Sequence, residues 1–266
     1  MKKIFAVLIT LLSIFNYSSA QNDTIYFLKN GIIINKQSIA ETDIDSAVFY
    51  QPYGYGANDI EGNIYATVIL GAQEWFAENL KTTKYNDGTD IPLGPDNSSF
   101  FGVNHDAYIC LDSCDFYGNI YNFFVIDSVA NGGRNACPIG WHVPSDEEWK
   151  ELESFLGMAT SDLDLEGTFR GTNEGSMLAG GDSLWYIGNL INDISFGSTD
   201  FNALPAKCFG FETPLNGMDK RFTAWWTSSP SSSSNAWIRS LDCNFTNIWR
   251  YNSQKIEGAQ IRCIKD

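Results

Sequence analysis

The chain has 266 residues, a formal net charge of −15 and an aromatic content of 14%, with eight tryptophans. Binding to nucleic acid requires clustered lysine and arginine, so this acidic composition argues against nucleic acid as a partner. The chain has only two histidines, His105 and His142. Most familiar catalytic and metal sites would therefore have to use one of these two residues.

Residues 1–20 have the pattern of a secretory signal peptide. Lys2 and Lys3 precede the apolar run IFAVLITLLSIF, and Ser18 and Ala20 supply small residues at the cleavage point. The run is shorter than the roughly 20 apolar residues that span a bilayer, and no second such run follows, so we expect no membrane span. Cleavage removes two lysines and no acid, which changes the net charge from −15 to −17.

We therefore expect an exported protein in the extracellular space, at the cell surface or in the periplasm. No cysteine follows the cleavage point, so a lipid anchor at that position is not expected. Residues 21–56 form a small N-terminal β module and a linker, since two β-rich runs flank the hairpin signal Asn30-Gly31 and a third run ends at Tyr50. The linker is rich in Pro, Gly and Asn, and the main domain covers residues 57–266.

Two segments of the main domain have helical patterns. In residues 117–128, aromatic side chains recur at helical spacing before Gly132 and Gly133, which predicts a helix. A second helix follows Ser145, which forms the capping-box pattern with Glu148, and it ends before Gly157.

Residues 136–152, ACPIGWHVPSDEEWKEL, lead into this second helix. Trp141 and Val143 alternate with His142, so an extended approach would direct the two apolar side chains inward and the histidine outward. We interpret His142 as a structural residue. Acidic residues in the first helical turn complement the helix dipole, which favours a structural role for them over acid–base catalysis.

The C-terminal segment AWWTSSPSSSSNAWIRSLDCNFTNIWRYNSQKIEGAQIRCIKD contains three β-like runs. They predict an antiparallel sheet that closes the domain, with residues 231–234 as a hairpin loop.

Several motifs resemble one family in its own order over residues 59–266. They are DIEGNIYATVILGAQEWFAENLKTTKYNDGTDIP, CPIGWHVPSDEEWKELESFLGM, FRGTNEGSMLAGG, FNALPA, WWTSSPSSSSNAWIRSL and AQIRCIKD. Together they are similar to the Fibrobacter succinogenes major paralogous domain. The resemblance implies an α+β fold of the C-type-lectin-like class, with two helices on irregular antiparallel sheets and the chain ends brought together. It implies no particular biochemical activity.

The same fold class includes the formylglycine-generating sulfatase-modifying enzymes, which work through a cysteine pair near the C-terminal end of the domain. Cys243 and Cys263 are the nearest counterparts here, but their surroundings do not match that motif. The chain also lacks the GxSxG, HExxH and phosphate-binding glycine motifs. We therefore predict a non-enzymatic protein, with an oxidoreductase of this type as the remote alternative.

Calcium is the one cofactor that the sequence allows, and we otherwise expect none. The EPN, QPD and WND motifs of calcium-dependent lectins are absent. In DLDLEGTFRGTN, the residues Asp162, Asp164 and Glu166 imitate positions 1, 3 and 5 of an EF-hand loop. Position 12 is Asn173, which lacks the bidentate carboxylate, so a solvated acidic loop is the alternative.

We predict a binding or adhesion protein of the cell envelope, with a glycan or an extracellular protein as its target. Aromatic side chains that could stack on a ligand are Trp225, Trp226, Trp237 and Trp249, which would otherwise fill the core. A structural component of a surface assembly is the alternative function.

Six cysteines in an exported chain favour disulfide bonds, and six allow 15 pairings. Cys137 precedes the second helix and Cys263 lies in the last strand, so we predict a bond between them. We also predict the pairs Cys208–Cys243 and Cys110–Cys114.

Overall fold

A computed structural model describes residues 24–29, 32–38, 54–95, 103–110, 113–206 and 220–266, which divide into two compact units between Tyr53 and Gly54. In the first unit, β1 (Thr24–Lys29) pairs antiparallel with β2 (Ile32–Ser38). This confirms that the two β-rich runs flanking Asn30-Gly31 pair antiparallel. The predicted signal peptide and the run ending at Tyr50 lie outside the described residues.

The second unit begins with a strand in the segment whose Pro, Gly and Asn content predicts a linker. β3 (Gly54–Asn58) pairs antiparallel with β4 (Ile64–Leu70). A Cβ atom at Gly56 would lie 2.6 Å from Cγ2 of Thr67, so close approach of the two strands requires glycine there. Gly56 therefore serves strand packing, and the second compact unit starts at Gly54.

A five-stranded sheet joins the beginning, the middle and the end of this unit. Its order is β3-β4-β5-β14-β8, where β5 is Gln73–Phe76, β14 is Ile264–Lys265 and β8 is Trp141–His142. The last strand pairs with both β5 and β8. The C-terminal residues are thus fixed between segments that precede them by more than a hundred positions.

The predicted helix over residues 117–128 is wrong. A short helix α2 (Cys114–Tyr117) is followed by β7 (Ile120–Asn122) and by the 3-10 turn η2 (Phe123–Val125). β7 is the centre of a three-stranded sheet, between β6 (Tyr108–Ile109) and β13 (Gly258–Ala259). All three residues of β7 are buried, so packing on several sides, and not one helical face, explains the aromatic spacing.

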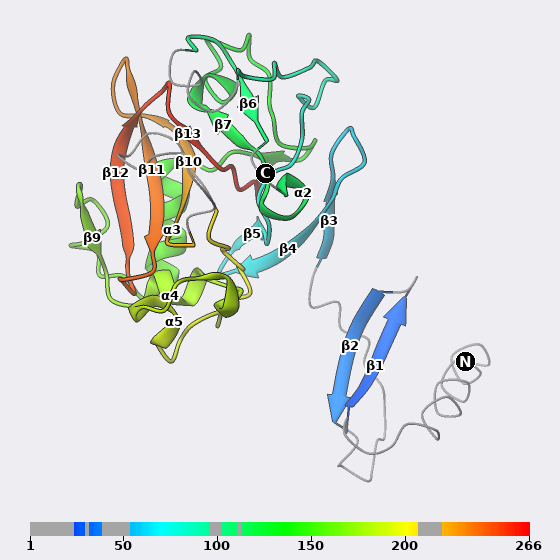
Figure 1. The fold of residues 1–266 in the computed structure, drawn as a ribbon, viewed down its shortest axis with the longest axis vertical. Coiled ribbons are helices and arrows are strands. Elements are labelled where there is room, and N and C mark those ends of the chain that lie inside the picture. The colour runs from blue at the N-terminus through cyan, green and yellow to red at the C-terminus, as the bar shows by residue number, and fades with distance from the viewer. Residues whose placement is uncertain (1–23, 30–31, 39–53, 96–102, 111–112, 207–219) are drawn as a thin grey trace. The chain divides into compact units, whose positions relative to one another are not determined.

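The C-terminal strands form the predicted antiparallel sheet. β10 (Phe222–Pro230), β11 (Asn235–Asp242) and β12 (Ile248–Gln254) are neighbours, and β9 (Thr168–Arg170) completes the sheet beside β12. Helix α3 (Asp146–Phe155) packs against it, as Figure 1 shows. The capping box between Ser145 and Glu148 is present as predicted.

Short elements and a ring-rich core complete the unit. The remaining elements are α4 (Glu174–Leu178), η3 (Asp182–Leu184) and α5 (Asn189–Asn192). Between α3 and the sheet, the centroid of the Trp149 ring lies 4.9 Å from the centroid of the Trp75 ring and 5.8 Å from that of the Trp225 ring. The fold is thus a mixed α and β structure with few helices and several antiparallel sheets. No helix in the described residues is long and apolar enough to cross a membrane.

Candidate binding surface

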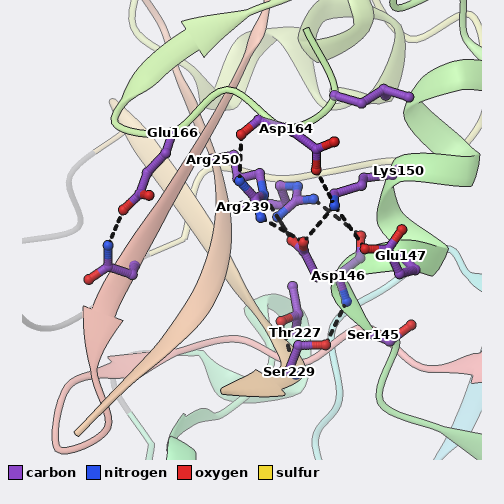
Figure 2. A network of polar contacts seen from close by, with 12 residues as sticks. Ser145, Asp146, Glu147, Lys150, Asp164, Glu166, Thr227, Ser229, Arg239 and Arg250 are labelled. Carbon is purple, nitrogen blue, oxygen red and sulfur yellow. Dashed lines mark hydrogen bonds and ion pairs between the residues drawn. The ribbon is translucent and has the colours of Figure 1, made fainter. Parts of the chain in front are cut away.

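Helix α3 is joined to the C-terminal sheet by a buried network of ion pairs, and Figure 2 shows the part of it around Asp146. The Asp146 carboxylate accepts hydrogen bonds of 2.7 Å from Arg239 and from Arg250. Two helical turns further on, Oε1 of Glu153 accepts bonds of 2.6 Å from Arg170 and Arg239. The seven-residue separation places both acids on the helix face toward the sheet. The three arginines lie on the facing strands β9, β11 and β12.

This network makes Asp146 a structural counter-ion. Burial by itself would raise the pKa of its carboxyl, but the hydrogen bond from Arg250 and the charge of Arg239 hold that pKa well below its usual range. Each of its carboxylate oxygens accepts a bond from an arginine. A carboxylate that is held ionised in this way is poorly suited to accept a proton from a substrate.

At the edge of the network, the loop after α3 contacts Lys150 and Arg250. Lys150 Nζ lies 2.5 Å from Asp164 and 2.8 Å from Glu147, and Arg250 donates to the backbone oxygen of Asp164 at 3.1 Å. Glu166 accepts a hydrogen bond from Asn252 (Figure 2). The loop is therefore attached to both α3 and β12.

These contacts do not support the calcium site that the loop suggested. Asp162 accepts a bond from the neighbouring Ser161, Asp164 binds Lys150, and Glu166 binds Asn252. The three carboxylates thus have different partners and do not converge. Among the described residues, no group of three or more His, Cys, Asp or Glu side chains is arranged to hold a metal ion.

Beside the network lies a partly exposed tryptophan with polar neighbours. The Arg250 guanidinium lies 3.6 Å from the centroid of the Trp237 ring. Trp237 is directly opposite Asn252 on the adjacent strand. Asn235, two residues before it, donates to Asn252 at 2.7 Å, and Asn252 donates to Glu166. We call Trp237, Asn235, Asn252 and Glu166 the Trp237 surface.

Burial and strand register place the four candidate tryptophans in different environments. Trp225 and Trp226 have no exposed area, and their indole nitrogens donate at 2.9 Å to Asn79 and to the Tyr121 carbonyl. Both belong to the core, so our prediction that they contact a ligand is corrected. Trp249 is paired with Ser240 and therefore lies on the sheet face opposite to Trp237.

Trp249 is also covered in part by other rings. It stacks on Phe169 at 5.3 Å and packs against Tyr251 at 4.5 Å between ring centroids. Trp237 and Trp249 are both partly exposed, and Trp237 is the one that lies beside hydrogen-bonded amide and carboxylate side chains.

A comparison with protein-family models matches residues 68–265 to the Fibrobacter succinogenes major domain. The match covers well over half of the chain. The chain belongs to this family. Searches of curated proteins and of solved structures gave no match. The major domain therefore includes α3, the C-terminal sheet and the whole Trp237 surface.

The disulfides of the major domain follow two of the three predicted pairs. Cys137–Cys263 and Cys110–Cys114 are both formed. Cys208 lies outside the described residues, so the pair Cys208–Cys243 stays a prediction. Cys263, one of the two counterparts of the enzyme cysteines, is bonded to Cys137. Disulfides persist in oxidising compartments, which accords with the expected export.

His142, in β8, contacts α3 through Glu148, on a different side of the helix from the one that faces the arginines. Its Nδ1 is 2.7 Å from an Asp266 carboxylate oxygen, and its Nε2 is 2.8 Å from Oε1 of Glu148. The hydrogen bond with Glu148 raises the pKa of His142, as does the bond with Asp266. Burial opposes ionisation of Glu148, but bonds from His142 and Ser145 lower its pKa to about 2. An open cavity of about 450 Å³ adjoins Glu148 and Asp266.

Several residues of these sites were missed by sequence reasoning. Arg239 and Arg250 were not identified as partners of the first helical turn, and Asn235 and Asn252 were not linked to Trp237. Alternation along β11 places Trp237 and Arg239 on one face, and this signal could have associated the tryptophan with a charged residue. The pairing of β11 with β12 is not evident from local sequence.

Proposed function

We propose that this protein is an exported, non-enzymatic binding protein of the cell envelope that recognises a glycan through the Trp237 surface. The observation that carries this proposal is the partly exposed Trp237 ring beside a hydrogen-bonded row of amide and carboxylate side chains. A sugar ring has an apolar C–H face and polar hydroxyl edges. An aromatic ring next to fixed polar groups is complementary to both.

The support beneath the Trp237 surface favours recognition, because it limits the conformational freedom that binding would have to remove. Arg250 lies against one face of the Trp237 ring, and Arg250 itself is held by two bonds to Asp146. The ring itself is partly exposed. Glu166 and Asn252 restrain each other at the neighbouring position.

We also propose that the domain is related to C-type-lectin-like folds. The supporting features are a helix packed on antiparallel strands and a last strand, β14, that joins the end of the chain to β5 and β8. In such an arrangement, a rigid sheet supports loops of variable sequence that contact ligands. The loop that contains Asp164 and Glu166 has this position relative to β12.

Screening of residues 21–266 on a glycan array, followed by titration calorimetry, tests the proposal. We expect Trp237→Ala to weaken binding by at least about tenfold, since loss of a central aromatic contact removes well over 1 kcal/mol. Trp237→Phe should retain part of the affinity.

The matched control is Trp249→Ala. It removes an indole ring from the adjacent strand, on the opposite face of the sheet. It should leave glycan affinity within about twofold while circular dichroism shows that both variants are folded. If no glycan binds, or if the two alanine variants lose affinity equally, the proposal is refuted. Incorporation of the chain into a surface assembly without glycan binding would favour the structural alternative.

A further inference from the structure

The positive charges nearest to the Trp237 surface are buried and paired. The side chain of Arg250 is 5% exposed and is bonded to Asp146, and Arg239 has no exposed area and bonds to Asp146 and Glu153. Lys150 is 12% exposed and lies within ion-pair distance of three carboxylates. A negatively charged ligand would have to break one of these pairs to gain a cationic partner, which leaves a buried charge uncompensated.

The charges at the exposed edge of the same region are negative. Glu166 belongs to the Trp237 surface and is exposed, and the side chains of Asp164 and Glu147 are 81% and 77% exposed. Their partners among the described side chains are Lys150 and the uncharged Asn252. Among Glu147, Asp164, Glu166, Lys150, Arg239 and Arg250, only the carboxylates are exposed. An approaching anion therefore meets negative charge and no exposed cation from this group.

The hydrogen-bonding capacity that remains on the surface suits hydroxyl groups. An amide nitrogen carries two hydrogens, and those of Asn235 and Asn252 each use one in the row that leads to Glu166. The second hydrogens are donors, and the other carboxylate oxygen of Glu166 is an acceptor. A hydroxyl can both donate and accept, so adjacent hydroxyls of one sugar can satisfy neighbouring groups of both kinds.

We propose that the ligand of the Trp237 surface is an uncharged saccharide and that the surface discriminates against carboxylated and sulfated sugars. This inference rests on the proposed function and adds the chemical class of the glycan. Glu166 is the residue that sets the discrimination, because it is the charged member of the surface. Trp237 supplies the affinity that neutral and acidic sugars share.

The test compares one polysaccharide in two charge states. The neutral polysaccharide that binds best among a β-glucan, an α-mannan and a galactan is measured beside its derivative with primary hydroxyls oxidised to carboxylates. We expect the neutral form to bind at least tenfold more tightly at low salt. Higher salt should reduce this ratio, because it screens repulsion between exposed charges.

Glu166→Gln preserves the shape of the side chain and removes its charge. We expect it to lower the ratio of neutral-polymer affinity to oxidised-polymer affinity at least threefold, and this ratio, not the affinity for either polymer alone, is the readout. Tighter binding of the oxidised polymer, or of the cationic polymer chitosan, to the unmodified protein would overturn the charge assignment and leave glycan binding intact. Absence of binding to every neutral, acidic and cationic polymer would refute the proposed function itself.

Discussion

At the scale of single residues, His142 has the most defined chemistry. Both ring nitrogens lie within hydrogen-bond distance of carboxylate oxygens, one on Glu148 and one on Asp266. A neutral imidazole carries a single N–H donor, so both bonds together require the protonated ring. The alternation of Trp141, His142 and Val143 correctly predicted that the histidine side chain lies outside the core, since the two neighbours are buried. Asp266 could not be predicted as a partner, because it is 124 residues away in sequence.

The raised pKa of His142 makes stability depend on pH. The stabilisation is fully present below the unfolded-state pKa of about 6.5 and is lost as pH rises through the higher folded-state value. We expect a loss of up to about 1 kcal/mol between pH 6 and pH 9, because the partly exposed group is screened by solvent. Urea denaturation at several pH values measures this change.

His142→Gln should show a smaller loss of stability over the same range. The other charged groups near this cluster are Glu74, Glu151 and Lys265, and they are unchanged in the variant. Equal pH dependence in both proteins would contradict the assignment to His142. Nuclear magnetic resonance titration of the ring gives the folded-state pKa directly.

At the scale of elements, helix α3 combines a local interaction that sets its beginning with ion pairs to distant strands. Its beginning was predicted from Ser145 and Glu148, since a capping box involves residues only three positions apart. On its buried face, Trp149 and Leu152 have no exposed area. The same face also carries Asp146, whose arginine partners lie on strands that follow it by more than ninety residues.

Removal of Asp146 should destabilise the junction between α3 and the sheet. Asp146→Ala leaves Arg239 and Arg250 buried without this carboxylate, and we expect a cost of about 3–5 kcal/mol in the free energy of unfolding. The matched control is Glu147→Ala, which removes an exposed acid from the adjacent helical position. Its cost should stay below about 1 kcal/mol in the same urea titration. Similar costs for both variants would show that the buried network contributes little.

The segment over residues 117–128 shows the limit of periodicity. Aromatic residues at helical spacing predicted a helix, but Ile120–Asn122 form a central strand of a small sheet. Side chains there also bind backbone groups of other segments, as Asn122 does with the His105 carbonyl at 2.8 Å. Spacing indicates a helix only where one face is buried, and this segment is enclosed on several sides.

At the scale of the whole molecule, the bond between Cys137 and Cys263 closes a loop of 126 residues. Its position beside β14 and β8 fixes the last strand to the middle of the domain. The chain-entropy model assigns about 4–5 kcal/mol to a loop of this length, and about 2 kcal/mol to the short loop between Cys110 and Cys114.

We therefore expect unequal effects when each bond is removed by paired serine substitutions. Loss of Cys137–Cys263 should lower the melting temperature much more than loss of Cys110–Cys114, as measured by calorimetry without reductant. Because Cys137 and Cys263 are completely buried, their replacement also introduces polar hydroxyls into the core. Paired alanine substitutions control for that effect, and an equal decrease for the two bonds would contradict the assignment.

The sequence by itself determined features that depend on nearby residues or on a run of family motifs. These include the first hairpin, the start of α3, the antiparallel C-terminal strands and membership in the Fibrobacter succinogenes major domain family. Turn geometry, helix capping and strand alternation act over a few positions. They can therefore be read without knowledge of the partner segments.

Only the tertiary structure decided which tryptophans belong to the core and which one lies at a polar surface. Trp225 and Trp237 both occupy strands of one sheet, yet the first is enclosed by α3 and the second is partly exposed beside Asn252. The physical reason is that burial depends on what distant segments place over a side chain. Strand register and the packing of α3 set those neighbours, and neither is encoded in the residues that immediately flank a tryptophan.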